Sequence, residues 1–131
     1  AAGGCQAEIG SASSMAAGVL TYLQGGNCEQ IATSAAMAMK NLLGLVCDPV
    51  AGLVEVPCVK RNVIGTVNAM ACADMAMAGI VSRIPPDQVM DAMKEVGDKM
   101  DASLRETALG GLAQTDEGMK IAEKMHASYE N

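Results

Sequence analysis

The sequence predicts an all-α fold, a compact bundle of about five to six helices, and three observations support this. Half of the 131 residues are apolar, yet Phe and Trp are absent, Tyr occurs twice and Met 11 times. Small side chains let helices approach closely and Met fills the gaps between them, whereas strands prefer β-branched and aromatic residues. Long Ala- and Met-rich runs are interrupted by Gly and Pro. The length suits one core, so we expect residues 1–131 to form a single all-helical domain.

Two helices are expected before residue 45. Residues 7–23 read as a helix that ends at a Gly-Gly pair, with Cys5 just before its first turn. A second helix is expected from Asn27, a suitable N-cap, to about Leu43. Because a helix N-terminus favours negative charge, Cys5 lies where a thiolate ligand would be stabilised.

A loop containing Pro and Gly separates the second and third helices and carries two cysteines, Cys47 and Cys58. Pro and Gly residues between them exclude a regular helix. A third helix is expected over residues 60–82. It is apolar nearly all round, so we expect it at the centre of the bundle, with Asp74 as a buried acid that needs a partner. A mid-bilayer Asp costs roughly 3 kcal/mol, which favours a core helix over a membrane span.

The pattern of the C-terminal third of the sequence predicts surface helices. After Pro86, which suits a first helical turn, apolar residues recur at helical spacing among charged ones: Val89, Met93, Val96 and Met100. Ser103 and Glu106 match a capping box and predict a short helix closed by Gly110-Gly111. Thr115 can cap a last helix whose first turn is acidic.

Charge and cysteine usage indicate the compartment and exclude some partners. The net charge of −6, without a basic tract or aromatic platform, argues against nucleic acid as a partner. Five cysteines are an odd number and are not clustered as in small secreted proteins, so we expect a reduced, cytoplasmic compartment and no membrane. No signal peptide and no initiator Met are visible, and we expect the chain to begin within a longer protein.

Three of the five cysteines share a position in the predicted fold. Cys5, Cys47 and Cys58 each lie at a junction between helix and loop, whereas Cys28 and Cys72 fall in helical segments. Three converging thiolates would suit zinc with one further ligand or an iron–sulfur cluster with one open iron. Their spacing matches no generic metal motif, and on spacing alone buried structural thiols are the more common case. The single histidine, near the C-terminus, is expected to be solvated.

Several strings carry more specific information. They are GGCQAEIGSA at 3–12, NLLGLVCDPVAGLVEVPC at 41–58 with KRN at 60–62, LRET at 104–107 and LGGLA at 109–113. Together they resemble the bacterial iron–sulfur-dependent L-serine dehydratases (L-serine ammonia-lyases). The resemblance extends over essentially all 131 residues and concerns the alpha chain, or the C-terminal half of the catalytic region.

The resemblance implies a lyase of amino-acid degradation and gluconeogenesis that converts L-serine to pyruvate and ammonia without pyridoxal phosphate. It implies that Cys5, Cys47 and Cys58 bind a [4Fe–4S] cluster through three irons. The fourth iron would act as a Lewis acid on the serine hydroxyl while a base removes the α-proton.

The same resemblance implies that other polypeptide completes the enzyme. We expect the catalytic base to lie outside this chain, in the remaining half of the catalytic domain or in a beta subunit or regulatory domain. By itself the chain is expected to be inactive and able to lose its cluster. Apolar helices beside the loop are expected to have faced the absent half, and a homo-oligomer could form through them.

Two sets of polar residues are candidates for binding the substrate. Lys60, Arg61 and Asn62 follow Cys58 directly and could bind its carboxylate, for which Arg is suited; alternatively they cap a helix and face solvent. Ser11 and Ser13 could contact substrate or cluster sulfurs, or instead bond backbone and let helices pack closely.

Three other functions compete with the serine lyase. The first is a related iron–sulfur lyase that acts on another β-substituted amino acid, such as cysteine. The second is an electron-transfer module, against which the presence of only three matching cysteines argues, because such a cluster is fully ligated. The third is a cluster-free helical interaction domain with buried cysteines.

Overall fold

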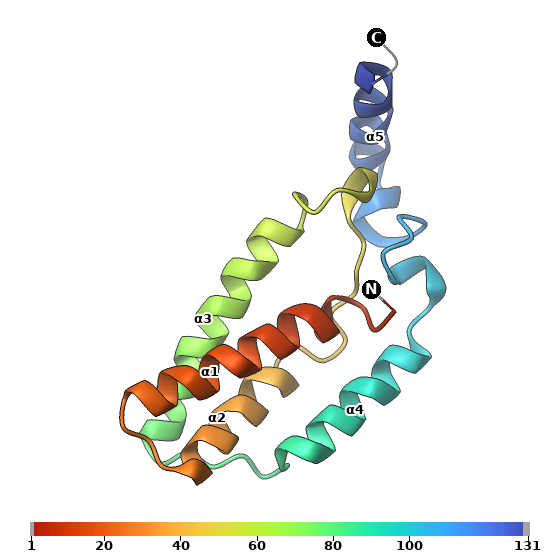
Figure 1. Cartoon of the computed structure of the whole chain (residues 1–131). Helices are drawn as coiled ribbons and strands as arrows, with labels where there is room; N and C mark the ends of the chain where they lie inside the picture. Colours follow the sequence, from red (N-terminus) through yellow and green to blue (C-terminus); the bar gives the residue numbers. More distant parts are fainter. Residues whose placement is uncertain (1, 130–131) are drawn as a thin grey trace.

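The computed structural model describes residues 2–129, which form five α-helices and no strand (Figure 1). The helices are α1 (Ser11–Leu23), α2 (Cys28–Lys40), α3 (Cys58–Met77), α4 (Pro86–Lys99) and α5 (Asp116–Tyr129). A π-helical turn, η1 (Gln6–Gly10), continues into α1. Three 3-10 turns lie in the connections: η2 (Val50–Gly52), η3 (Ala102–Leu104) and η4 (Gly111–Gln114). The predicted all-α fold is confirmed.

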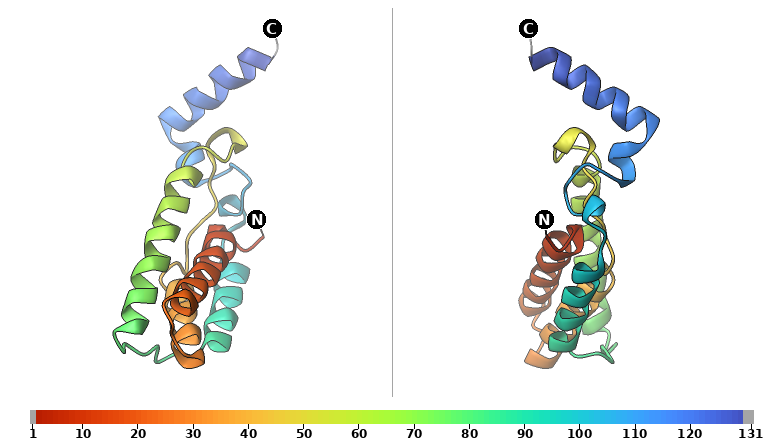
Figure 2. Two further views of the ribbon diagram at one scale, coloured as in Figure 1. Left: turned by 60° about the vertical axis from the view of Figure 1, so that its left-hand side comes forward. Right: turned by 90° about the vertical axis from the view of Figure 1, so that its right-hand side faces the viewer.

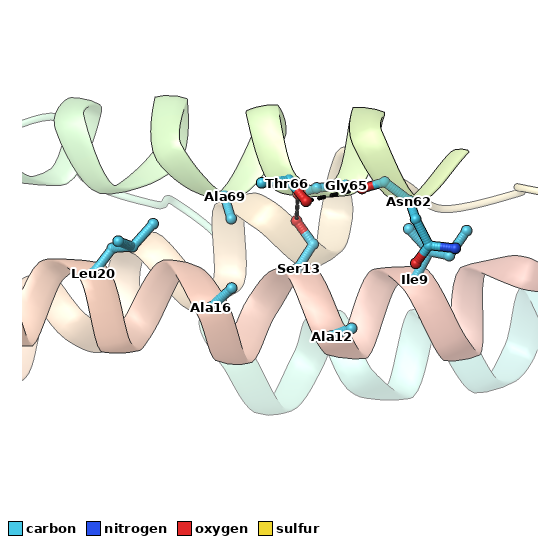
Figure 3. Close-up of a pocket in the computed structure, with 9 residues that line it drawn as sticks. All are labelled: Ile9, Ala12, Ser13, Ala16, Leu20, Asn62, Gly65, Thr66 and Ala69. Carbon is cyan, nitrogen blue, oxygen red and sulfur yellow. Dashed lines mark hydrogen bonds between the residues drawn. The ribbon is translucent and has the colours of Figure 1, made fainter. Parts of the chain in front are cut away.

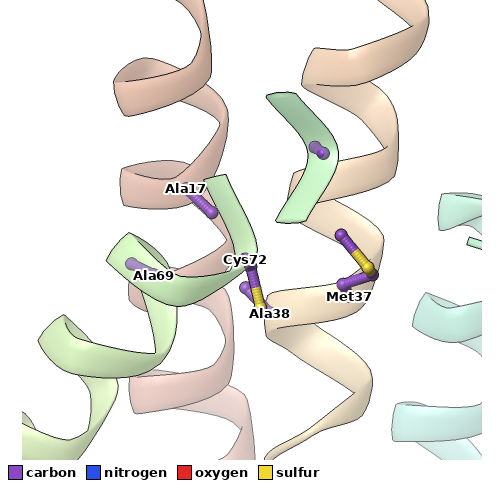
Figure 4. Close-up of a cluster of buried hydrophobic side chains, with 6 residues drawn as sticks. Ala17, Met37, Ala38, Ala69 and Cys72 are labelled. Carbon is purple, nitrogen blue, oxygen red and sulfur yellow. The ribbon is translucent and has the colours of Figure 1, made fainter. Parts of the chain in front are cut away.

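The main core lies where α1, α2 and α3 pack on one another. Its buried residues are nearly all small: Ala17, Met37, Ala38, Ala69, Cys72 and Ala76. Figure 4 shows the first five of these converging from the three helices. Cys72 is fully buried among them. Gly65 of α3 permits a close approach to η1, because an added Cβ would lie 2.7 Å from Cγ2 of Ile9.

A side-chain hydrogen-bond network joins the same three helices. The Ser13 hydroxyl of α1 donates to the Gly65 carbonyl of α3 at 2.7 Å. The Asn68 amide of α3 donates to the Ser13 hydroxyl and to the Ala38 carbonyl of α2, both at 2.9 Å. In the described part of the chain, every buried side-chain nitrogen and oxygen has a partner. The bundle therefore satisfies its buried polar groups internally.

The prediction that the third helix is central was wrong, because α3 has one face exposed. Val63, Val67 and Met70 are 56–60% exposed, and Asp74, expected to be buried, is exposed as well. It is α2 that contacts α1, α3 and α4. A row of apolar side chains on α3 is therefore left exposed by the other described elements. Among the described residues no helix is both long enough and apolar enough to cross a membrane.

The last two helices differ in how they join the bundle. α4 packs along α2, with Val89 buried and Pro86 in its first turn as predicted. α5 projects away from the bundle, and its main contacts are with η2 and η4 (Figure 2). The Thr115 hydroxyl accepts the Gly118 N–H at 3.1 Å, which confirms the predicted N-cap of the last helix.

The short helix predicted from the capping box at Ser103 does not form. The Asp101 carboxylate accepts the Ser103 N–H at 2.8 Å and opens the brief turn η3 instead. Glu106 then adopts a left-handed backbone conformation, with φ of 68°. The physical reason is a long-range pairing, since the Glu106 N–H donates to the Cys47 carbonyl at 2.7 Å and the Cys47 N–H to the Leu104 carbonyl at 2.8 Å. This pairing, which the local pattern does not encode, replaces helical hydrogen bonds.

Candidate metal centre

The three cysteines expected to act together line one pocket. Cys5 is the N-cap of η1, Cys47 lies in the loop after α2, and Cys58 is the first residue of α3. The pocket, which we call the cysteine pocket, has a volume of about 360 Å³. Its other lining residues are Glu8, Ile9, Ala12, Pro49, Val54, Val59, Asn62 and Glu106. Cys28, exposed at the start of α2, and Cys72, in the core, do not line it.

Burial and the neighbouring Cys5 raise the pKa of the Cys47 and Cys58 thiols. Cys5 and Cys47 are 2% and 3% exposed and pack against Ile9. Burial, reinforced by the neighbouring Cys5, raises the pKa of Cys47 to about 12. The pKa of Cys58 is raised by burial and then by Cys5. Because a bound metal stabilises the thiolate form, ligation would release protons from this pocket.

Gln6 fixes the segment that carries Cys5. Its side chain is 1% exposed, and its two ends reach different elements. The side-chain oxygen accepts the Gly44 N–H at 3.0 Å, and the side-chain nitrogen donates to the Met93 carbonyl of α4 at 2.9 Å. Its backbone N–H donates to the Leu45 carbonyl at 2.9 Å. Gln6 therefore ties Cys5 to the chain that leads into Cys47.

An ion pair between Asp48 and Arg61, which we call the charged clamp, lies next to Cys5 and Cys47 and links the other segments. An Asp48 oxygen accepts from Nη1 of Arg61 at 2.7 Å, and its second oxygen accepts the Leu112 N–H at 2.8 Å. The same Nη1 donates to the Val46 carbonyl at 2.8 Å and lies 4.0 Å from the Cys5 sulfur. Neither Gln6 nor Asp48 was singled out from the sequence, although both directly follow a cysteine.

The five residues that the sequence suggested for substrate binding differ in whether they line the cysteine pocket. Asn62 lines the cysteine pocket and donates its side-chain amide to the Cys58 carbonyl at 2.9 Å. Arg61 contacts Asp48 as described, Lys60 is exposed on α3, and neither lines the pocket. Ser11 is half-buried outside the lining, and Ser13 donates to the α3 backbone. Of the five, Asn62 alone lines the described cysteine pocket.

The charged residues of the pocket lining are acidic. Glu8 and Glu106 line it, whereas the lining contains no Lys, Arg or His among residues 2–129. The single histidine, His126, is exposed on α5 and borders a separate pocket against η2 and η4. A cationic group is therefore what this pocket best accommodates.

The spacing of the thiols distinguishes between kinds of metal site. Within the described residues, no three His, Cys, Asp or Glu side chains are close enough to hold one metal ion. In an iron–sulfur cluster each thiolate binds a different iron, so the ligands are spread around the cluster body. Three cysteines that line one pocket, without being close enough in the described structure to share one metal ion, fit such a cluster better than a single zinc ion.

Comparison with known proteins agrees with the resemblance seen in the sequence. Residues 1–113 match the family model described as serine dehydratase alpha chain. The chain is 62% identical over 121 residues to a probable L-serine dehydratase, alpha chain, of Latilactobacillus sakei, which covers 92% of this chain and 58% of that protein. It is 61% identical over 125 residues to a protein so described from Bacillus subtilis (strain 168), covering 95% of this chain and 42% of that protein.

A more distant relative is L-serine dehydratase 1 of Escherichia coli (strain K12), which is 49% identical over 111 residues, 84% of this chain and 24% of that protein. The chain thus spans less than two thirds of the length of each of these relatives. With most of its length matched by the family model, the chain belongs to the serine dehydratase alpha chain family.

Proposed function

We propose that this chain is part of an iron–sulfur L-serine dehydratase, a lyase that converts L-serine to pyruvate and ammonia. Family membership supports the reaction, since the relatives are described as L-serine dehydratases. The observation that carries the proposal is the convergence of Cys5, Cys47 and Cys58 on one pocket, while the other two cysteines lie elsewhere.

The three cysteines would hold a [4Fe–4S] cluster and leave one iron without a protein ligand. When bound, the cluster would supply a Lewis acid that makes a hydroxyl group easier to expel. The buried Ile9 packs against Cys5 and Cys47 and strengthens electrostatic interactions on that side of the pocket, whereas Val54 and Val59 are more than half exposed.

The polar residues of the lining suggest how the substrate is oriented. Glu8 and Glu106 suit the α-ammonium group of an amino acid, and Asn62 can donate or accept a hydrogen bond. A cation for the substrate carboxylate would come from outside this chain, because the lining of the described pocket offers neither Lys, Arg nor His. We assign the general base to the absent part of the enzyme as well, as the family resemblance implies. All five cysteines are free thiols, which together with an oxygen-sensitive cluster favours the cytoplasm.

Most of the outward surface of α1 and α3 is apolar and indicates a covering partner. α1 contains no charged residue, and its outward side chains are 56–72% exposed: Met15, Val19, Tyr22 and Leu23. A groove of about 210 Å³ runs between α1 and α3 (Figure 3). Ile9, Ala12 and Asn62 line both this groove and the cysteine pocket, so a segment lying in the groove would border the site.

We propose the rest of the alpha chain as the occupant of this groove, since the two alpha-chain relatives have 42% and 58% of their length outside the matched region, which is 100% minus the 58% and 42% covered. In the full-length enzyme, Ala16→Glu, at an exposed position of the groove lining, should lower the temperature of unfolding because it places a charge under the covering segment. Met90→Glu on α4, a side chain that is 48% exposed, is the matched control and should change it little. Equal effects would mean that the groove is open to solvent, and a halved mass of Ala16→Glu in sedimentation would identify a second copy instead.

The reaction is tested with the full-length holoenzyme purified without oxygen. We expect pyruvate to form from L-serine, activity to disappear with the iron on exposure to air, and pyridoxal phosphate to have no effect. Assays with L-cysteine and L-threonine define the substrate preference. Serine deamination that continues after all iron is removed would refute the cluster-based reaction.

A further inference from the structure

We propose that the charged clamp positions Cys5 and Cys47 and sets the electrostatic potential at the cluster they hold, so that Arg61 is a positioning residue and not a ligand of the substrate carboxylate. The effect on the electrostatic potential rests on the proposed function, because it requires the cluster. The positioning of Cys5 and Cys47 applies to the metal-free protein as well.

The clamp joins four segments that are distant in the sequence. Arg61 comes from α3, Asp48 and the Val46 carbonyl from the loop around Cys47, and the Leu112 N–H from η4. The fourth segment is that of Cys5, whose sulfur lies 4.0 Å from Nη1 of Arg61. One guanidinium nitrogen thus faces the Cys5 sulfur and both residues that flank Cys47.

The clamp is buried, with side chains that are 4% (Asp48) and 15% (Arg61) exposed. A buried ion pair gains little stability over an apolar replacement of similar size, because both charges lose their hydration. Its geometry here is that of a fixed support, since both Asp48 oxygens are hydrogen-bonded. The backbone is also adapted to it: at Gly111, with φ of +61°, an added Cβ would lie 2.4 Å from an Asp48 oxygen.

The placement of Arg61 argues against its binding the substrate directly. Arg61 does not line the cysteine pocket, and its charge is balanced by Asp48 at 2.7 Å. What it offers to the pocket is a positive charge whose Nη1 lies 4.0 Å from the Cys5 sulfur. Hydrogen bonds and charges near the sulfurs are among the factors that set the reduction potential of an iron–sulfur cluster.

The two halves of the clamp should therefore act on the cluster with opposite sign. Arg61→Gln leaves a buried negative charge beside Cys47, which makes the cluster harder to reduce. Asp48→Asn leaves a buried positive charge beside Cys5, which makes the cluster easier to reduce. A purely structural support would not give opposite signs, because loss of either partner would loosen the site in the same way.

The test uses the full-length holoenzyme, and the readout is the reduction potential of the cluster in samples with equal iron content. We expect a more negative potential for Arg61→Gln, a more positive one for Asp48→Asn, and a return toward the unmodified value for the double variant. Arg61→Lys keeps the charge and should hold the potential while iron is lost faster. The exposed pair Lys94 and Asp98, changed to Gln and Asn, is the control and should shift neither quantity. Shifts of the same sign, or none, would overturn the electrostatic role.

A double-mutant cycle on unfolding of the metal-free enzyme separates this proposal from the proposed function. If the unmodified holoenzyme holds no iron, the cluster proposal fails, and with it the electrostatic role. The positioning role is then decided by the cycle. Coupling between Asp48→Asn and Arg61→Gln, with the double variant less destabilised than the sum of the single ones, supports the clamp, and additivity refutes it.

Discussion

The α1–α3 core and the cysteine pocket are held together by different kinds of contact. The core is a set of alanines with Met37 and Cys72, packed closely and joined by the bonds of Ser13 and Asn68. The pocket depends on a buried ion pair and on the two-ended side chain of Gln6. Packing in the core is spread over many small contacts, whereas a polar support has few members and each one matters. The core therefore provides most of the stability of the fold, whereas the polar contacts fix the positions of the cysteines.

Backbone conformation follows the same division. The non-glycine residues with positive φ in the described chain are Ala51, Glu106 and Ala108, and all of them lie in the connections around the pocket. Such conformations cost about 1–3 kcal/mol each and persist where the surroundings impose them. Here the surroundings are the pairing of Glu106 with Cys47 and the folded loop at η2. The core helices carry no such strain.

The largest effect is expected from Gly111→Ala, beside the charged clamp. A left-handed conformation costs an alanine roughly 1–2 kcal/mol, and its Cβ would collide with the Asp48 carboxylate. We expect the free energy of unfolding to fall by about 3 kcal/mol or more, and iron content to fall with it. Denaturant unfolding and iron analysis of the full-length enzyme measure both.

Gly25→Ala is the matched control for the clamp. Gly25 has φ of +83°, but an added Cβ would meet nothing within 4 Å. This variant should show only the backbone cost, roughly 1–2 kcal/mol, with iron content unchanged. If both variants lose the same stability and the same iron, the contact between Gly111 and Asp48 is irrelevant to the site.

A smaller effect is expected in the core from Gly65→Ala. Its Cβ would lie 2.7 Å from Cγ2 of Ile9, and overpacking costs roughly 1–3 kcal/mol, partly offset by the roughly 1 kcal/mol that alanine gains in a helix. Gly18→Ala, with its nearest atom at 3.6 Å, should instead stabilise by up to about 1 kcal/mol. Thermal unfolding of the two variants shows whether their signs differ. Equal signs would mean that the core is looser than the close contact at Gly65 indicates.

The sequence predicted the helical framework well because its signals are local. The N-cap Asn27, Pro86 in a first turn and Thr115 before the last helix all act within four residues, and each was found as expected. The grouping of Cys5, Cys47 and Cys58 was also predicted, since helix–loop junctions can meet at one end of a bundle.

What the sequence could not give depends on contacts between distant segments. The capping box at Ser103 was outweighed by the pairing of Glu106 with Cys47, which lies 59 positions earlier in the chain (106 minus 47). The central place expected for α3 assumed that its apolar face is covered by residues of this chain, yet Val67 is exposed. The role of Arg61 likewise required knowing that Asp48 lies 2.7 Å away.

The smallest effect is expected from the exposed ion pair on α4, which contrasts with the buried clamp. Lys94 and Asp98 are 2.5 Å apart but 76% and 66% exposed, so water and salt screen them. The hydrogen bond from Lys94 lowers the pKa of Asp98. The pair's contribution is present above the ordinary pKa of Asp and lost as the pH falls through the lowered one. Lys94→Gln should move this pKa upward in an NMR titration and leave the unfolding midpoint at neutral pH unchanged; a marked loss there would contradict the contrast.

The most direct test of the central claim is the iron content of the full-length enzyme after each cysteine is changed singly to Ser under anaerobic conditions. Removal of Cys5, Cys47 or Cys58 should abolish the cluster and its visible absorption, because each would supply one thiolate. Cys28→Ser and Cys72→Ser should retain it, although loss of the buried Cys72 sulfur can lower stability. A cluster that survives the loss of Cys5, Cys47 or Cys58, or that requires Cys28 or Cys72, would contradict the assignment of this pocket.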